Sequence, residues 1–178
     1  TRVRLTAEGG AGVSEWFHAF RHAQGYEVWG QHGAWITAQQ PAFGPGLKER
    51  FAWASTITEE QRAEAEATRA RVRERLQEVL GDDGVLLMPT TPGPAPIKGL
   101  PSKELEAFRF KALQLTCPAG LGGAPQVTLP VAKVEDAPVG LSLLGPRGAD
   151  EWLLEMAGAI GGVAEGGVAP LQPSGVGH

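Results

Sequence analysis

Residues 85–92 read VLLMPTTP, an uninterrupted apolar run that ends abruptly in a rigid polar turn. Because both alternating sets of side chains in the run are apolar, it predicts a strand that is buried on both faces. Ligand sites in α/β proteins lie where such strands run out into turns. Thr90 and Thr91 are therefore candidate substrate-binding residues, although threonine hydroxyls also satisfy the amides of ordinary turns.

Downstream of this strand, helical and strand-like patterns alternate. The helical segments carry apolar residues three or four positions apart, and the strand-like segments are short apolar runs between turn residues. The expected elements are a helix capped by Ser102 over residues 103–115, a Gly/Pro-rich loop over 116–125, strands over 126–131 and 139–144, and a helix that begins at Asp150.

Upstream, the clearest helix is expected over residues 59–80. Thr58 and Gln61 have the spacing of a capping box, and Gly81 follows the last apolar residue, where helices commonly end. Two less regular elements precede it: a short strand over residues 1–6, and a helix capped by Ser14 that Gly25 breaks into pieces.

The order of these elements places the chain in the α/β class, with a mixed sheet flanked by helices. Its 178 residues suffice for one domain, and the net charge of −4, without an isolated Lys/Arg cluster, argues against a nucleic-acid partner. No apolar run approaches the roughly 18 residues of a membrane helix. The single cysteine, Cys117, excludes an internal disulfide. We therefore expect a soluble, cytoplasmic protein without a membrane partner.

Three other candidate sites have weaker support. His18 and His22 are spaced to share a helix face, but a zinc site needs a third ligand, and the glutamate usual beside the first histidine is absent. A nucleophilic Cys117 needs a base nearby, and no feature of the sequence supplies one. We therefore interpret Cys117 as a small residue in the wall of the site. Thr1 has the α-amine that an N-terminal threonine nucleophile requires, but an arbitrary cut also leaves such a residue.

Several segments together resemble the C-terminal half of amidase signature family enzymes. They are VLLMPTTP at 85–92, LTCPAGLGGAPQVTLP at 115–130, PVGLSLLGP at 138–146 and DEWLL at 150–154. The resemblance covers roughly residues 14–160 and lies nearest to small-amide hydrolases similar to indoleacetamide hydrolase. It implies the C-terminal part of the amidase signature fold over residues 1–160, followed by a flexible Gly/Pro-rich tail over 161–178.

The resemblance also implies a chemistry. Family members hydrolyse a carboxamide to a carboxylate and ammonia through a Ser–cis-Ser–Lys triad, without metal or cofactor, and backbone amides stabilise the oxyanion. In this sequence no serine lies in a Gly-Gly-Ser-Ser-Gly-Gly loop, and no lysine lies in an apolar strand. We therefore expect the triad in an N-terminal half that is missing here, and no catalytic residue is assigned.

Two functions remain open. In the first, the chain is one wall of an amidase, inert alone, with Thr90, Thr91, Thr116 and Cys117 contacting a small amide substrate. An exposed sheet edge then predicts either a complementing N-terminal half or self-association. In the second, the chain is a non-catalytic module that binds a small ligand or a protein through the same exposed cleft face.

Overall fold

The computed structural model describes residues 2–6, 12–44 and 46–164, which form five helices and three strands. The α/β class expected from the sequence is confirmed. In chain order the elements are α1 (Val13–Gln39), α2 (Leu47–Ala54), α3 (Glu59–Leu80), β1 (Leu86–Pro89), α4 (Ser102–Gly122), β2 (Gln126–Val134), β3 (Ala137–Leu144) and α5 (Asp150–Ala164).

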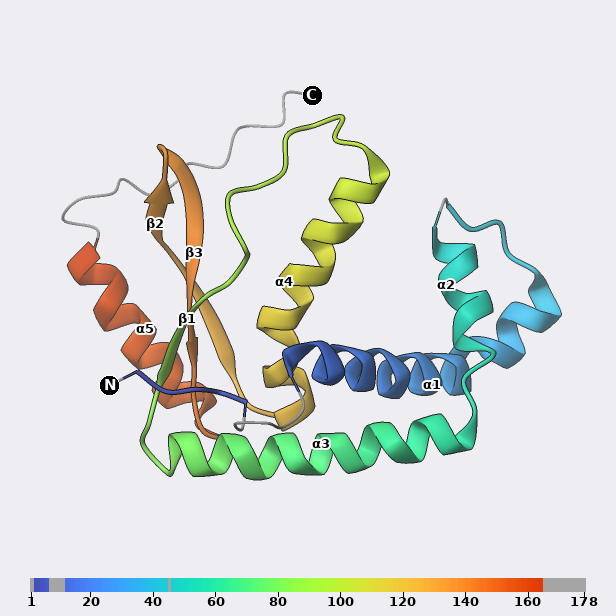
Figure 1. Ribbon diagram of the computed structural model, residues 1–178, viewed down its shortest axis with the longest axis horizontal. Helices are drawn as coiled ribbons and strands as arrows, with labels where there is room; N and C mark the ends of the chain where they lie inside the picture. Colours follow the sequence, from blue (N-terminus) through green and yellow to red (C-terminus); the bar gives the residue numbers. More distant parts are fainter. Residues whose placement is uncertain (1, 7–11, 45, 165–178) are drawn as a thin grey trace.

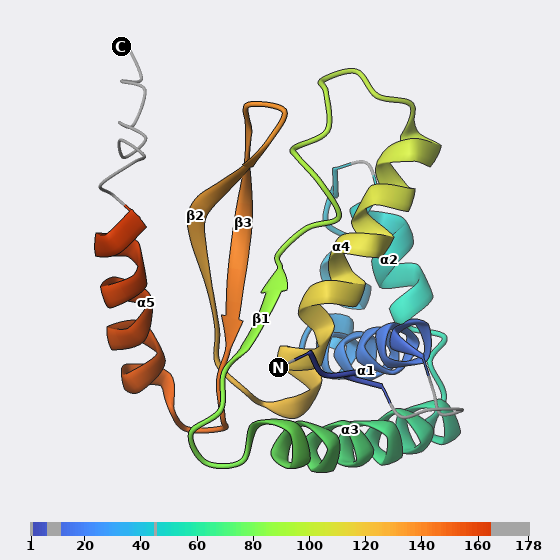
Figure 2. The ribbon, with the colours of Figure 1, turned by 60° about the vertical axis from the view of Figure 1, so that its left-hand side comes forward.

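The sheet lies between two groups of helices (Figures 1 and 2). On one side, α5 contacts β2 and β3. On the other side, α1, α3 and α4 contact one another, and α2 packs on α1 at the end far from the sheet. The surface formed by α1, α2 and α4 on the side away from the sheet is therefore not covered by the strands.

β3 is the central strand, and the order is β1-β3-β2. Both pairings are antiparallel, so the described strands do not form the mixed sheet that we expected. The physical reason is a hairpin: Glu135 and Asp136 have φ of 49° and 65°, the left-handed pair that closes a two-residue turn between antiparallel strands. β1 then adds antiparallel to the other side of β3.

Two hydrophobic cores meet on β3. Leu143 and Leu144 are both 0% exposed and, as successive strand residues, point to opposite faces. Leu144 belongs to the core that includes Leu121 of α4 and Leu76 of α3. Leu143 belongs to the second core, with Leu153 of α5. This strand therefore joins the two helical layers.

The prediction of a doubly buried strand at residues 85–88 was wrong. β1 begins at Leu86, and its side chains alternate between half-buried and exposed, with Leu87 59% exposed. β1 pairs only with β3 among the described strands, so one of its edges has no neighbour there. The doubly buried strand is β3 instead, whose Gly140 and Ser142 interrupt the apolar run that sequence inspection seeks.

The loop predicted from residue 116 was also wrong, because α4 continues to Gly122 with Pro118 inside it. A proline inside a helix costs a backbone hydrogen bond, but here Cys117, Pro118 and Leu121 are buried, and packing overrides the local preference. Gly122 lets α4 approach α3, since a Cβ there would collide with Leu76.

The N-terminal predictions need correction as well. Residues 2–6 form no strand; the Arg75 guanidinium holds this segment by donating to the carbonyls of Arg4 (2.7 Å) and Leu5 (3.1 Å). The first helix is capped by Gly12 instead of Ser14, and it continues unbroken through Gly25. A Cβ on Gly25 would lie 2.9 Å from the Trp53 ring, so the glycine permits the close contact of α1 with α2.

The prediction for residues 59–80 is confirmed. Thr58 Oγ1 accepts from the Gln61 amide (3.3 Å), and Gln61 Oε1 accepts from the Thr58 amide (3.0 Å), which completes the capping box. At the other end of the chain, α5 continues to Ala164, past the expected start of the tail, and residues 165–178 lie outside the described part. None of the described helices combines the length and the apolar character that crossing a bilayer requires.

Replacing Gly25 by alanine should destabilise the protein by about 1–3 kcal/mol, because the added methyl overpacks the contact with Trp53 and Ile57. Gly30→Ala is the matched control on the same helix. Apart from its chain neighbours and the backbone of its own helix, nothing lies within 4 Å of its new methyl, so it should stabilise the protein by up to about 1 kcal/mol through helix propensity. Urea unfolding followed by circular dichroism measures both; equal effects would contradict the packing role of Gly25.

Candidate functional site

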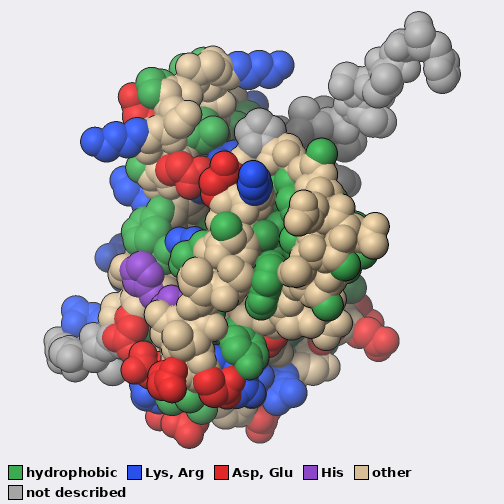
Figure 3. All heavy atoms as spheres, turned by 90° about the vertical axis from the view of Figure 1, so that its right-hand side faces the viewer, with side chains coloured by type: hydrophobic (Ala, Val, Ile, Leu, Met, Phe, Trp, Pro, Cys, Tyr) green, Lys and Arg blue, Asp and Glu red, His purple; other side chains and the backbone are tan. Residues whose placement is uncertain are grey.

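A hollow of about 880 Å³ opens between α1, α2, α4 and the turn after β1. Figure 3 views the molecule from the side of α2, and on this face hydrophobic side chains lie exposed among acidic and basic ones. The lining is mostly apolar and includes five aromatic residues: Phe17, Phe20, Phe51, Trp53 and Phe110. A mostly apolar concavity with a few polar groups is the usual form of a small-molecule site.

Three of the four predicted substrate-binding residues line this hollow. Thr90 and Thr91 reach it from the turn after β1, and Thr116 reaches it from α4. Cys117 does not line it: its side chain is 1% exposed and belongs to the core behind α4. The fold therefore brings together threonines from two separate segments and turns the neighbouring cysteine inward.

Two of these threonines present hydrogen-bond acceptors to the hollow. Thr91 Oγ1 donates to the Gly93 carbonyl (2.7 Å), and Thr116 Oγ1 donates to the Ala112 carbonyl (3.2 Å). A hydroxyl has one proton and two lone pairs. Because each proton is already used, what remains for a ligand is the oxygen, which suits a donor such as an amide N–H.

The third threonine, Thr90, belongs to a partly buried hydroxyl network centred on Ser142. Its Oγ1 lies 2.8 Å from Ser142 Oγ and 3.3 Å from Thr128 Oγ1. Gln126 Nε2 donates to Ser142 Oγ (2.9 Å), so the Ser142 proton is left for Thr90 or Thr128. Gly140 makes room for this arrangement, because a Cβ there would lie 2.7 Å from Thr90 Oγ1. The network fixes the position of the Thr90 hydroxyl.

This network is not among the features predicted from the sequence, although the sequence contains a signal for it. Gln126 and Thr128 are two residues apart and so share one face of β2, and Thr128 lies opposite Ser142 in the ladder. Polar residues at alternate positions of two short apolar strands mark a polar face of the sheet, but the pairing register that aligns them is not visible in the sequence.

The histidines pack against aromatic rings. The His18 ring lies 5.4 Å from that of Phe17, and the His22 ring stacks on Trp53 at 5.8 Å. Partial burial, together with neighbouring positive charge, lowers the pKa of His22. No group of three potential metal ligands occurs among the described residues. Thr1, the other alternative, lies outside the described part.

Three arginines also line the hollow: Arg21, Arg50 and Arg109. Arg21 places its guanidinium carbon 4.3 Å from the centre of the Trp53 ring, a cation–π contact. Arg109 pairs with Glu106 on the same helix at 2.6 Å. These arginines come from three different helices, so their proximity could not be predicted from the sequence.

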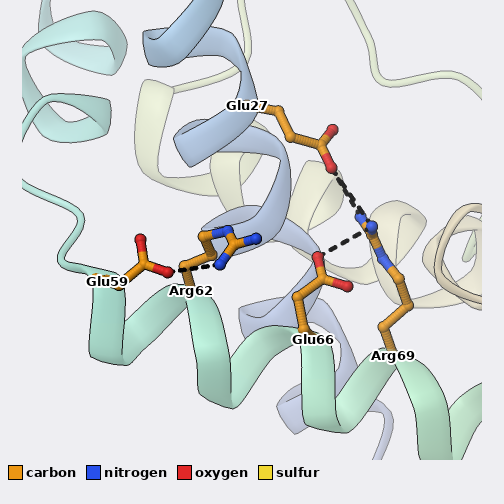
Figure 4. A network of polar contacts seen from close by, with 5 residues as sticks. All are labelled: Glu27, Glu59, Arg62, Glu66 and Arg69. Atoms are coloured by element: carbon orange, nitrogen blue, oxygen red, sulfur yellow. Dashed lines mark hydrogen bonds and ion pairs between the residues drawn. The ribbon is translucent and has the colours of Figure 1, made fainter.

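The wall formed by α1 is held on α3 by an ion-pair network (Figure 4). Arg69 of α3 contacts Glu27 of α1 at 3.3 Å and Glu66 of its own helix at 3.0 Å. Figure 4 also shows the Glu59–Arg62 pair, about two turns before the Glu66–Arg69 pair on α3. The carboxylates of these pairs are exposed, so each pair contributes little by itself, but the Arg69–Glu27 pair links α1 to α3.

Replacing Ser142 by alanine should destabilise the protein by about 1–3 kcal/mol, because the Gln126 amide group loses its buried partner. Ser102→Ala serves as the control, since Ser102 is exposed and is the first residue of α4, whose N-cap is Pro101 and not Ser102 as expected; it should leave the free energy of unfolding unchanged. Urea denaturation of both variants tests this. A neutral Ser142→Ala would show that the network does not hold the sheet.

Burial raises the pKa of the Cys117 thiol to about 12. At pH 8 only a very small fraction of the thiol is therefore in the reactive thiolate form. The buried sulfur is also inaccessible to reagents in solution. Ellman's reagent should label the folded protein very slowly and the urea-unfolded protein fully. Labelling at the same rate in both states would contradict the buried position and reopen the possibility of a reactive cysteine.

The comparisons with known proteins agree with the fold. The sequence profile described as Amidase matches residues 33–154. Amidase 1 of Arabidopsis thaliana is 35% identical over 142 residues, which is 80% of this chain and 33% of that protein. Outer envelope protein 64, chloroplastic, of the same plant is 33% identical over 134 residues, or 74% of this chain and 22% of the relative.

The solved structures show the same relationship. A crystal structure described as that of an amidase superposes with a TM-score of 0.72 at 28% identity, covering 85% of this chain and 36% of that chain. The chain thus spans about a third or less of the length of these relatives. Because the profile matches more than half of the chain, the chain belongs to the amidase signature family.

Proposed function

We propose that this chain forms a substrate-facing wall of an amidase that hydrolyses the C–N bond of a small carboxamide to a carboxylate and ammonia. The observation that supports this most directly is the convergence of Thr90, Thr91 and Thr116 on one apolar hollow. The Thr91 and Thr116 oxygens are suited to accept hydrogen bonds from the substrate amide, and the aromatic lining is suited to bury the acyl group.

We propose that the nucleophile, the bridging serine and the lysine lie outside these 178 residues. Of the described serines, Ser14, Ser55 and Ser102 are exposed, and Ser142 is 0% exposed and bonded to threonines and a glutamine. No lysine donates to a serine among the described residues, and every described lysine is exposed. A Ser–cis-Ser–Lys triad would need the opposite, a lysine held against a serine.

In this arrangement the chain contributes binding and orientation instead of bond cleavage. The wall holds the acyl group and the amide nitrogen while the serine supplied elsewhere attacks the carbonyl carbon and ammonia departs. Orienting a substrate is a large part of a catalytic effect. No metal or organic cofactor is needed for this chemistry, and we propose none.

The partner and location proposals follow from the same arrangement. Residues 1–160 would be the C-terminal half of one domain, with 161–178 as a tail. The outer edges of β1 and β2 have no strand beside them in the described part, so an N-terminal half or a second copy would pair there. A single unpaired cysteine fits a reducing cytoplasm.

A second candidate is a non-catalytic binding module that uses the same cleft face. The observation that favours it is the 33% identity to a relative named as an outer envelope protein, not as an enzyme. The coding sequence upstream of Thr1 discriminates between the two: a lysine followed by a Gly/Ser-rich loop supports the amidase wall, and a start codon directly before Thr1 supports the module.

The 178-residue chain alone should release no ammonia from phenylacetamide or indole-3-acetamide. It should nevertheless bind phenylacetamide weakly, with shifts of the Thr90, Thr91 and Thr116 amide signals in two-dimensional NMR. Thr116→Val should weaken this binding about two- to tenfold, since one hydrogen-bond acceptor is lost. Turnover that survives replacement of both Cys117 and Thr1 would contradict an inert wall.

Thr37→Val is the matched control. Thr37 is a helical threonine that donates to the carbonyl four residues earlier, as Thr116 does, but it does not line the hollow. This variant should bind phenylacetamide like the parent chain. Equal effects of the two valine substitutions would remove the support for the hollow as the substrate wall.

A further inference from the structure

We propose that the hollow carries an anion subsite formed by Arg21 and Arg50, so that its substrate is an amide with a carboxylate on the acyl side. This inference rests on the proposed function, because it assumes that the hollow receives the acyl group. It goes further by naming a charged substrate class, which neither the threonines nor the aromatic lining indicates.

The subsite lies where two cavities meet. A second hollow of about 640 Å³ shares several lining residues with the first, including Arg21, Arg50 and Trp53. These residues come from α1 and α2, whereas Thr90 and Thr91 line only the first hollow. A ligand in the first hollow therefore has polar oxygens and guanidinium groups supplied by different elements.

The charges around the second hollow do not cancel. Arg21, Arg50 and Arg109 face it together with two acids, Glu49 and Glu106, and the first hollow adds no further acid. Glu106 is already paired with Arg109 at 2.6 Å. If Glu49 is counted as fully charged, the three arginines still outnumber the two acids. The lining therefore has a positive net charge, although the whole chain has a net charge of −4.

Two of the arginines have no carboxylate partner in the described part of the chain. Arg21 rests on aromatic rings, with its guanidinium carbon 4.3 Å from the Trp53 ring centre and 5.7 Å from that of Phe17. Arg50 forms no ion pair with a described residue. Stacking on Trp53 leaves the guanidinium edge and its N–H donors available for a ligand.

A carboxylate on an apolar body matches this combination. A guanidinium presents N–H donors in a planar fork that fits the two carboxylate oxygens. The rings of Phe17 and Trp53 beside it are suited to an aromatic or aliphatic linker. Inorganic phosphate would satisfy the charge alone but would leave the apolar lining uncovered, so the proposal is a carboxylate-bearing amide and not a free anion.

The test compares two probes on the whole 178-residue chain by NMR titration. One is phenylacetamide, and the other is 4-(carbamoylmethyl)benzoate, the same amide with a carboxylate on the ring. We expect the charged probe to bind more tightly and its affinity to fall as salt is raised. Arg50→Gln and Arg21→Gln should each weaken its binding about two- to fivefold, because exposed ion pairs are weak, and should lower the affinity for phenylacetamide by a smaller factor.

Arg73→Gln is the matched control. Arg73 is an exposed arginine of α3 that lines neither of these two hollows, and its loss should not affect either probe. Circular dichroism should show that all three variants remain folded, which surface substitutions allow.

The outcomes separate the two proposals. If phenylacetamide shifts the hollow's threonines but the carboxylate adds no affinity, the anion subsite is wrong and the amidase wall stands. If neither probe shifts Thr90, Thr91 or Thr116, both proposals fail. If inorganic phosphate shifts the same signals as strongly as the charged amide, the site is a general anion site and the substrate assignment is wrong.

Discussion

The structure depends on the burial of β3 from both sides. Leu143 and Leu144 are adjacent in the chain and fully buried, yet they serve different cores. Burying one large aliphatic side chain contributes about 1.5–3 kcal/mol, so this pair accounts for an appreciable share of a marginal folding free energy. Without β3 between them, α5 and the α1–α3–α4 group would have no common surface.

The same strand positions the candidate site. Ser142 comes directly before the two leucines and points to the same face as Leu144. It is the polar residue at which Gln126, Thr128 and Thr90 meet. The hydrophobic contacts that order β3 therefore also order Thr90, which lines the hollow. The packing of the core and the geometry of the candidate site therefore depend on the same strand.

Local signals in the sequence predicted some of this fold well. The helix over 59–80 was correct at both ends, because a capping box and a terminal glycine are encoded by neighbouring residues. The family resemblance was carried by several segments in the right order, and the family match supports it. Thr90, Thr91 and Thr116 were proposed from strand and helix ends, and they share a hollow.

The errors arose where tertiary contacts override local preference. Pro118 indicated a loop, but burial against neighbouring helices keeps it helical. The all-apolar run at 85–88 indicated a central strand, whereas the central strand is one that contains Gly140 and Ser142. The arginines of the hollow could not be grouped from the sequence, since residues on three helices meet only after those helices pack.

Because Leu143 and Leu144 are adjacent and belong to opposite cores, residues cannot easily be inserted into or deleted from this part of β3. Inserting or deleting one codon just upstream in β3 would exchange the inward and outward faces of the residues before it. Ser142 would then point toward α5, and Gln126 and Thr128 would lose their hydrogen bonds to its hydroxyl. Substitutions in this segment keep the register, whereas an inserted residue is accommodated best in the exposed Glu135–Asp136 turn.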